Sequence, residues 1–197
     1  MTGNHGVLPQ QGLPQRKSIR LKGYDYSRAG LYFITICTQM RLCLFGEIRN
    51  GEMILNDAGM MIKTLWHEIP IYYHEFNVHE FVVMPNHVHG IVEIASNPKS
   101  VGAGPRACPV NKCQRTNGQP QGVAPTMSLS DIVHRFKTLT TKRYIDGVNN
   151  NDWQRFNKKL WQRNFYEHII RDHESYLKIA EYIQTNPLKW REDKYYE

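Results

Sequence analysis

Apolar residues along the chain fall into runs and alternations that predict five strand segments. Residues 31–38, Leu-Tyr-Phe-Ile-Thr-Ile-Cys-Thr, are rich in β-branched and aromatic side chains, as expected of a buried strand. Residues 44–48 and 53–55 flank an Asn-Gly pair, the strongest short turn signal, and predict a hairpin. Residues 79–84 and 87–94 predict two more strands, joined either by a tight turn or through a bulge.

Three segments have the capping residues and apolar spacing of helices. Asn56 can cap a helix over 57–68, and Ser128 opens a Ser-x-x-Asp capping box for a helix to about residue 145. The third helix covers residues 174–185 and ends before a proline. In the second helix we expect three apolar residues to face inward: Ile132, Phe136 and Leu139.

The order of these elements, with a short strand starting at 160–163, predicts an α+β sandwich. It would have one mostly antiparallel sheet with helices on one face. The Gly-, Pro- and Gln-rich residues 1–15 predict a disordered tail, and residues 96–126 predict a flexible insertion loop. A single domain then covers 16–190, and residues 191–197 form a C-terminal tail.

Charge points to an anionic partner. Lys and Arg total 25 against 18 Asp and Glu, which gives a net charge of +7 and a pI near 9.2. Such an excess is typical of nucleic-acid binding, and its clustering argues against a merely soluble basic protein. The residues expected to contact DNA phosphates are Arg16, Lys17, Arg20 and Lys22 in one group, and Arg135, Lys137, Lys142, Arg143 and Arg163 in the other.

Several classes of protein are disfavoured. No apolar stretch approaches the roughly 18 residues needed to span a bilayer, and the N-terminus lacks the apolar segment of a signal peptide, so we expect a cytoplasmic protein. The four cysteines lack a second nearby ligand pair and are predicted to be free thiols. Phosphate-loop, dinucleotide-binding and serine-hydrolase motifs are absent from the sequence.

Two local patterns could carry chemistry. In a strand, His87 and His89 project to the same face while Val88 points to the other, so the imidazoles could form half of a metal site. Tyr182 and Asn186 lie one helical turn apart and offer a phenol nucleophile and an amide oxygen. Spacing alone favours plainer interpretations: two unrelated surface histidines, a core tyrosine and a helix-capping asparagine.

Four blocks together resemble a known family. In this order, RLKGYDYSRAGLYFITICT, FVVMPNHVHGIVEI, SLSDIVHRFKTLTTKRY and LWQRNFYEHIIRDHESYLKIAEYIQTNP resemble the single-tyrosine transposases among the HUH endonucleases. They are most similar to the REP-associated branch. The resemblance covers about residues 16–190, is interrupted by 96–126, and implies a ferredoxin-like, RRM-like core. It also implies that His87, His89 and Asn186 bind a divalent metal and that Tyr182 is the nucleophile.

The resemblance implies an activity as well. A family member would cut and rejoin single-stranded or hairpin DNA through a 5′-phosphotyrosine, with Mg²⁺ in cells and Mn²⁺ also effective in vitro. It would act as a monomer or homodimer associated with the nucleoid. Two alternatives remain: a catalytically idle hairpin-DNA-binding protein, and a zinc hydrolase, which would need a third histidine or acid at clear ligand spacing.

Overall fold

The structure is a computed structural model that describes residues 21, 23–95 and 127–196. The predicted tail 1–15 and the insertion 96–126 lie outside these residues, as do four of the basic residues expected to bind DNA: Arg16, Lys17, Arg20 and Lys22.

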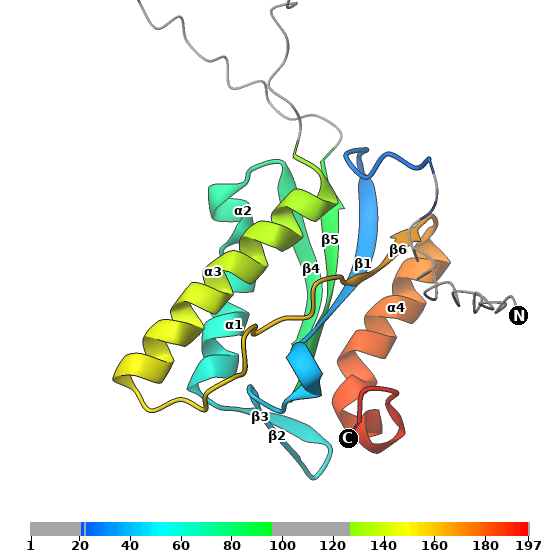
Figure 1. Cartoon of the computed structure of the whole chain (residues 1–197). Coiled ribbons are helices and arrows are strands. Elements are labelled where there is room, and N and C mark those ends of the chain that lie inside the picture. The colour runs from blue at the N-terminus through cyan, green and yellow to red at the C-terminus, as the bar shows by residue number, and fades with distance from the viewer. Residues whose placement is uncertain (1–20, 22, 96–126, 197) are drawn as a thin grey trace, which may run out of the picture.

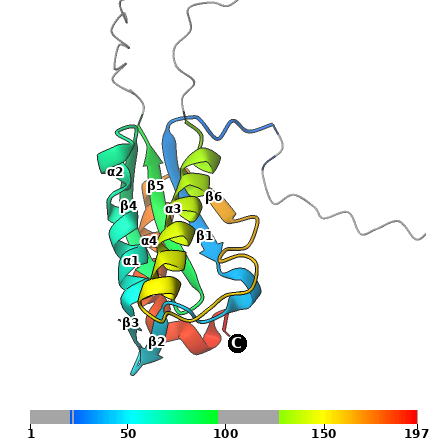
Figure 2. The ribbon, with the colours of Figure 1, turned by 60° about the vertical axis from the view of Figure 1, so that its left-hand side comes forward.

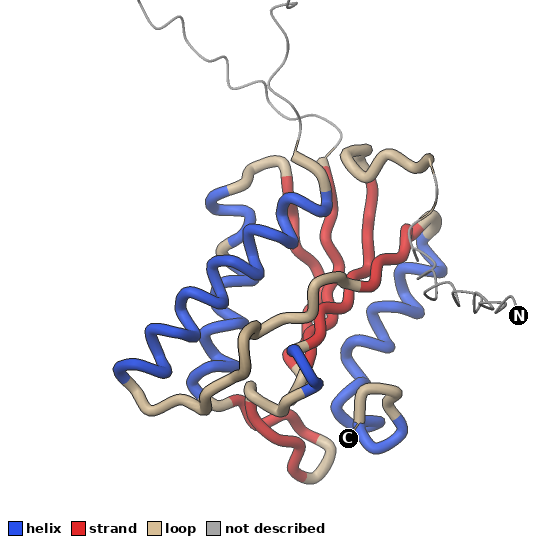
Figure 3. Tube along the Cα trace, viewed as in Figure 1, coloured by secondary structure: helices blue, strands red, loops and turns tan. Residues whose placement is uncertain are grey.

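A four-stranded sheet forms the centre of the fold (Figures 1 and 3). Its strands are β1 (Gly30–Cys37), β4 (Phe76–Val83), β5 (His87–Ile94) and β6 (Tyr166–Ile170). They lie in the order β4-β5-β1-β6, and each neighbouring pair is antiparallel. The predicted hairpin is present as β2 (Gly46–Arg49) and β3 (Glu52–Leu55).

Helices connect and flank these strands. They are α1 (Asp57–His67), α2 (Ile69–Tyr72), α3 (Leu129–Asn150) and α4 (His173–Thr185), with 3₁₀ turns η1 (Gln39–Arg41) and η2 (Asn186–Glu192). The side chain of Asn56 caps α1 as predicted, by accepting from the Gly59 N–H at 2.9 Å. The predicted capping box of Ser128 and Asp131 starts α3. Among the described residues, no helix is both long and apolar enough to cross a membrane.

The strand order is that of a ferredoxin-like fold, so the predicted α+β class is confirmed. The core strands β1, β4, β5 and β6 alternate with α1 and α3 along the chain, and each crossover places its helix on the same face. The prediction that helices cover only one face is wrong, because α4 packs on the opposite face (Figure 2).

The two faces of the sheet have separate apolar cores, as the two-residue period of a strand requires. Tyr32, Ile34 and Ile36 of β1 join the large core beneath α1 and α3. Phe33 of β1 joins a smaller core on the other face, where Ile183 of α4 is buried. The side chains of the odd-numbered residues of β5 therefore face α4.

Two local predictions need correction. Leu139 is 39% exposed, and Thr140 is buried in its place, where its hydroxyl accepts from the Trp161 indole at 2.9 Å. In the predicted strand at 160–163 only Trp161 pairs, through one bridge to Thr38. The carbonyls of the following residues turn toward Lys137, whose ammonium group donates to them, so no ladder can continue.

Candidate active site

His87 and His89 lie side by side on the α4 face of β5. Their Nε2 atoms are 3.0 Å apart, and both side chains are at most 1% exposed. Val88 points into the core on the opposite face, as the strand period predicts. The connection between β4 and β5 at residues 84–86 is a tight turn, which starts β5 at His87 itself.

A polar side chain lies within hydrogen-bonding distance of the Nδ1 atom of each imidazole and fixes the ring. Asn86 Oδ1 lies 2.8 Å from His87 Nδ1, while the amide nitrogen of Asn86 donates to the carbonyls of Arg41 and Tyr195. This orientation leaves Asn86 Oδ1 to accept from His87 Nδ1–H. Thr35 Oγ1 lies 2.8 Å from His89 Nδ1 and can accept in the same way. Both Nε2 lone pairs are then directed into one shared space.

Electrostatics keep both rings neutral at pH 7. Burial lowers the pKa of His87 to about 4, the negative charge of Asp193 opposes this, and the nearby positive charges of Lys194 and Arg41 add to it. Burial also holds the pKa of His89 well below its ordinary value, with His87 contributing. Neutral imidazole is the form that binds a metal ion.

The donor set fits a divalent cation. Two ligand atoms about 2.1 Å from an octahedral ion are separated by about 3.0 Å, the separation of the two Nε2 atoms. Asn186 Oδ1 is buried and has no hydrogen-bond partner within the described part of the chain, so a further oxygen donor is available. An Asp193 carboxylate oxygen lies within 4.8 Å of the two imidazole ligand atoms.

Tyr182 and Asn186 meet this pair from α4. The Tyr182 hydroxyl lies 3.3 Å from His89 Nε2, and its side chain is 39% exposed. Asn186 is at the end of α4, where it still has helical dihedral angles, and its amide also bonds the Tyr182 hydroxyl. Both line a pocket of ≈ 460 Å³ together with Thr35 and His89. Strand and helix therefore bring all four predicted residues together.

The phenol of Tyr182 is not activated in this arrangement. Burial raises its pKa to about 12, and the negative charge of Asp193 acts in the same direction. At neutral pH the hydroxyl is protonated, so any nucleophilic role requires a further positive charge nearby.

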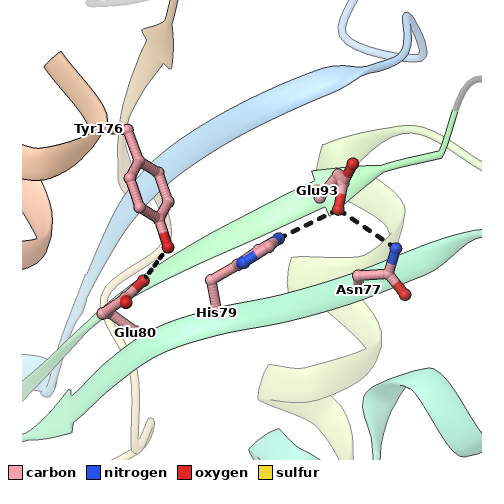
Figure 4. Close-up of polar contacts among 5 residues, drawn as sticks. All are labelled: Asn77, His79, Glu80, Glu93 and Tyr176. Carbon is pink, nitrogen blue, oxygen red and sulfur yellow. Dashed lines mark hydrogen bonds and ion pairs between the residues drawn. The ribbon is translucent and has the colours of Figure 1, made fainter. Parts of the chain in front are cut away.

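Polar contacts at the other end of α4 hold the helix on the sheet (Figure 4). The Tyr176 hydroxyl donates to Glu80 of β4 at 2.6 Å, and the pKa of Tyr176 is raised to about 12 by this bond. On the same face, His79 and Asn77 both contact Glu93, at 3.0 and 3.2 Å. Since α4 docks on the sheet of its own chain, Tyr182 reaches a histidine pair of that chain.

Comparisons with known proteins find similar sequences and folds among transposases. Residues 122–186, which include α3, β6, α4 and Asn186, match the family model described as "Transposase IS200 like". A putative REP-associated tyrosine transposase of Haemophilus influenzae is 22% identical over 165 residues, covering 84% of this chain and 74% of the relative. These two matches make the chain similar to IS200-like transposases.

Two other similarities extend over most of the chain. An uncharacterized protein of Haemophilus influenzae is 43% identical over 188 residues, which is 94% of this chain and 95% of that protein. A solved REP-associated tyrosine transposase bound to a REP hairpin has 19% identity and a TM-score of 0.51, over 87% of this chain and 74% of that chain. The two proteins share a fold.

The C-terminal residues of the chain contribute to the site, which the sequence did not predict. Of the predicted tail 191–197, the described residues fold against the histidine pair. The Tyr195 ring lies 4.6 Å from the His87 ring, centroid to centroid, and the Arg41 guanidinium donates to the Lys194 carbonyl at 3.0 Å. Asn86 and Thr35 were missed as well, although Asn86 directly precedes the first histidine.

The predicted DNA contacts on α3 lie on the other face of the sheet from the histidines. Arg135 stacks over the Tyr73 ring at 5.4 Å, and Lys137 holds backbone carbonyls, including that of Gln162 at 3.0 Å. Lys142 and Arg143 on α3 are exposed to solvent, as is Arg163, which lies in the segment before β6. The structure does not bring this group to the pocket, and its role in DNA binding stays a prediction.

Proposed function

We propose that this protein nicks and joins single-stranded, hairpin-containing DNA through a 5′-phosphotyrosine on Tyr182. The observation that carries the proposal is the 3.3 Å approach of the Tyr182 hydroxyl to His89 Nε2, beside a second imidazole with its lone pair in the same space. A phenol at a buried pair of neutral imidazoles is a suitable arrangement for metal-assisted phosphoryl transfer. The site would work in the cytoplasm, on nucleoid DNA.

The reaction exchanges one phosphodiester for another. The Tyr182 oxygen forms a bond to phosphorus as the bond between phosphorus and the 3′-oxygen breaks. The phenolic proton is lost, and the 3′-oxygen leaves as a hydroxyl group. Attack of a 3′-hydroxyl on the phosphotyrosine reverses the step, so DNA can be rejoined without another energy source.

His87, His89 and Asn186 would hold the divalent ion, Mg²⁺ in cells with Mn²⁺ also effective. When bound, the ion supplies Lewis acidity at the scissile phosphate. The chain's own residues do the rest: Asn86 and Thr35 fix the two imidazoles, and α4 carries the phenol to the pocket. The exposed part of Tyr182 leaves the pocket open to a DNA strand.

The test is covalent capture of hairpin DNA. A 5′-phosphotyrosine retains the downstream fragment, so a 3′-end label should migrate with the protein on denaturing gels while a 5′-end label is released. Tyr182→Phe should bind the hairpin and form no adduct, because only the hydroxyl is removed. Tyr72→Phe is the matched control, since Tyr72 is 66% exposed on α2.

Two results would count against the proposal. An adduct that maps to a peptide without Tyr182 would show that another group is the nucleophile. Hairpin binding with no adduct in Mg²⁺ or Mn²⁺ would favour the catalytically idle DNA-binding protein, and the raised pKa of Tyr182 is the structural feature that agrees with that alternative.

A further inference from the structure

Asp193 has the position of a metal ligand, although it lies in a segment that the sequence predicted as a tail. One of its carboxylate oxygens and the ligand nitrogens of His87 and His89 all lie within 4.8 Å of one another. Within the described residues, this is the one such group of histidine, cysteine and acidic side chains. Its negative charge also acts on the site: it opposes the lowering of the His87 pKa by burial and adds to the raising of the Tyr182 pKa.

Several contacts hold Asp193 in this position. Its backbone N–H donates to the Trp190 carbonyl at 3.1 Å and closes η2, and the buried Trp190 ring lies 5.9 Å from that of His87. One carboxylate oxygen accepts from the Tyr195 N–H at 2.8 Å. The other accepts from the Asn186 amide nitrogen at 3.0 Å. The carboxylate is therefore fixed by its own turn and by α4.

The bond to Asn186 also orients that side chain. An ionised carboxylate repels an amide oxygen, so Asn186 turns its nitrogen to Asp193 and keeps Oδ1 as the orphaned buried acceptor. Asp193 thus leaves the oxygen of Asn186 free for the role proposed above. The two side chains are complementary and do not compete.

Charge gives an independent reason for a carboxylate here. Two neutral imidazoles and an amide supply no negative charge, and imidazole is softer than Mg²⁺ or Mn²⁺ prefers. A carboxylate oxygen is a hard, anionic ligand that would offset part of the charge of a divalent ion in a buried site.

We infer that Asp193 is a protein ligand of the divalent metal, together with His87 and His89; this rests on the proposed metal-dependent function. Since Asp193 belongs to the segment 190–196, metal binding would also fasten that segment over the histidine pair.

The test is Mn²⁺ binding to the full chain, measured by the loss of the free-ion electron paramagnetic resonance signal. Asp193→Asn keeps the shape of the side chain and removes its charge, so Mn²⁺ affinity should fall by about 10- to 100-fold. Glu192→Gln is the matched control, because this neighbouring acid lines the same pocket and is exposed. Equal affinity of Asp193→Asn and the unchanged protein would overturn the inference.

His87→Ala separates this inference from the proposed function. If His87→Ala loses Mn²⁺ binding and Asp193→Asn does not, the assignment of Asp193 as a ligand is wrong and the histidine site stands. If His87→Ala binds Mn²⁺ as the unchanged protein does, the proposed histidine metal site is itself wrong. If Asp193→Asn does not fold, hydrogen exchange on the unchanged protein decides. Mn²⁺ should slow exchange of the Tyr195 amide, which donates to Asp193, and an unaltered rate at saturating Mn²⁺ would overturn the inference.

Discussion

Replacing Asn86 with alanine should weaken both the metal site and the attachment of the C-terminal segment. The Asn86 side chain is fully buried and makes three hydrogen bonds, accepting from His87 and donating to the carbonyls of Arg41 and Tyr195. One side chain therefore joins the histidine strand, η1 and the end of the chain. Alanine removes all three bonds and leaves the backbone of the turn in place.

The magnitude follows from the groups left without partners. Each buried polar group that loses its bond costs about 1–3 kcal/mol, and water entering the new space would satisfy some of them. A loss of about 2–4 kcal/mol in the free energy of unfolding is therefore expected. Freeing His87 to rotate or to change tautomer should also weaken metal binding by about 10- to 100-fold, as for other second-layer ligand contacts.

Urea unfolding in the presence of a chelator measures the first effect, and Mn²⁺ titration measures the second. Asn77→Ala is the control, because Asn77 is an exposed asparagine on the same sheet with one contact, to Glu93 at 3.2 Å. An Asn86→Ala protein as stable as Asn77→Ala, or one that binds Mn²⁺ with unchanged affinity, would refute this account of how His87 is fixed.

The remaining predictions concern acid, packing and salt. Without metal, the free energy of unfolding should fall by about 3 kcal/mol from pH 7 to pH 4. The reason is that the pKa of His87 is lowered to about 4 in the folded protein, so unfolding takes up a proton in this range of pH. Urea midpoints that stay constant would contradict this prediction. Gly90→Ala should cost about 1–3 kcal/mol by the same measurement, since a Cβ there would lie 2.4 Å from the Trp66 ring; a stability unchanged from the native protein would show that this ring can move. Affinity for hairpin DNA should fall with salt, and Lys142→Glu with Arg143→Glu should flatten that dependence; an equal slope would remove α3 from the DNA path.

The fold was predictable where the signals are local. The apolar, β-branched runs in 31–38 and 87–94 and the caps at Asn56 and Ser128 identify strands and helices to within a few residues, because these signals act on neighbouring backbone. Leu139 was misplaced because a helical stripe alone does not say which flank meets the sheet. The polar Thr140 is buried there by its bond to Trp161, a tertiary contact.

The four predicted site residues come together for the same local reason. His87 and His89 share a strand face, Tyr182 and Asn186 share a helix face, and one tertiary contact, α4 on β5, joins the two pairs. That contact depends on α4 packing on the face opposite to α3, and the strand pattern could not assign this face because both faces of β1 are apolar.

Asp193 could not be identified from the spacing of residues in the sequence. No third acid or histidine stands at ligand spacing from the histidine pair, because spacing rules apply within one strand or helix. Asp193 reaches the pair through η2, whose path is set by burial of Trp190 and by the bond from Asn86 to the Tyr195 carbonyl. The absence of a nearby ligand in the sequence therefore carries little weight against a metal site when a later segment can fold over the strand.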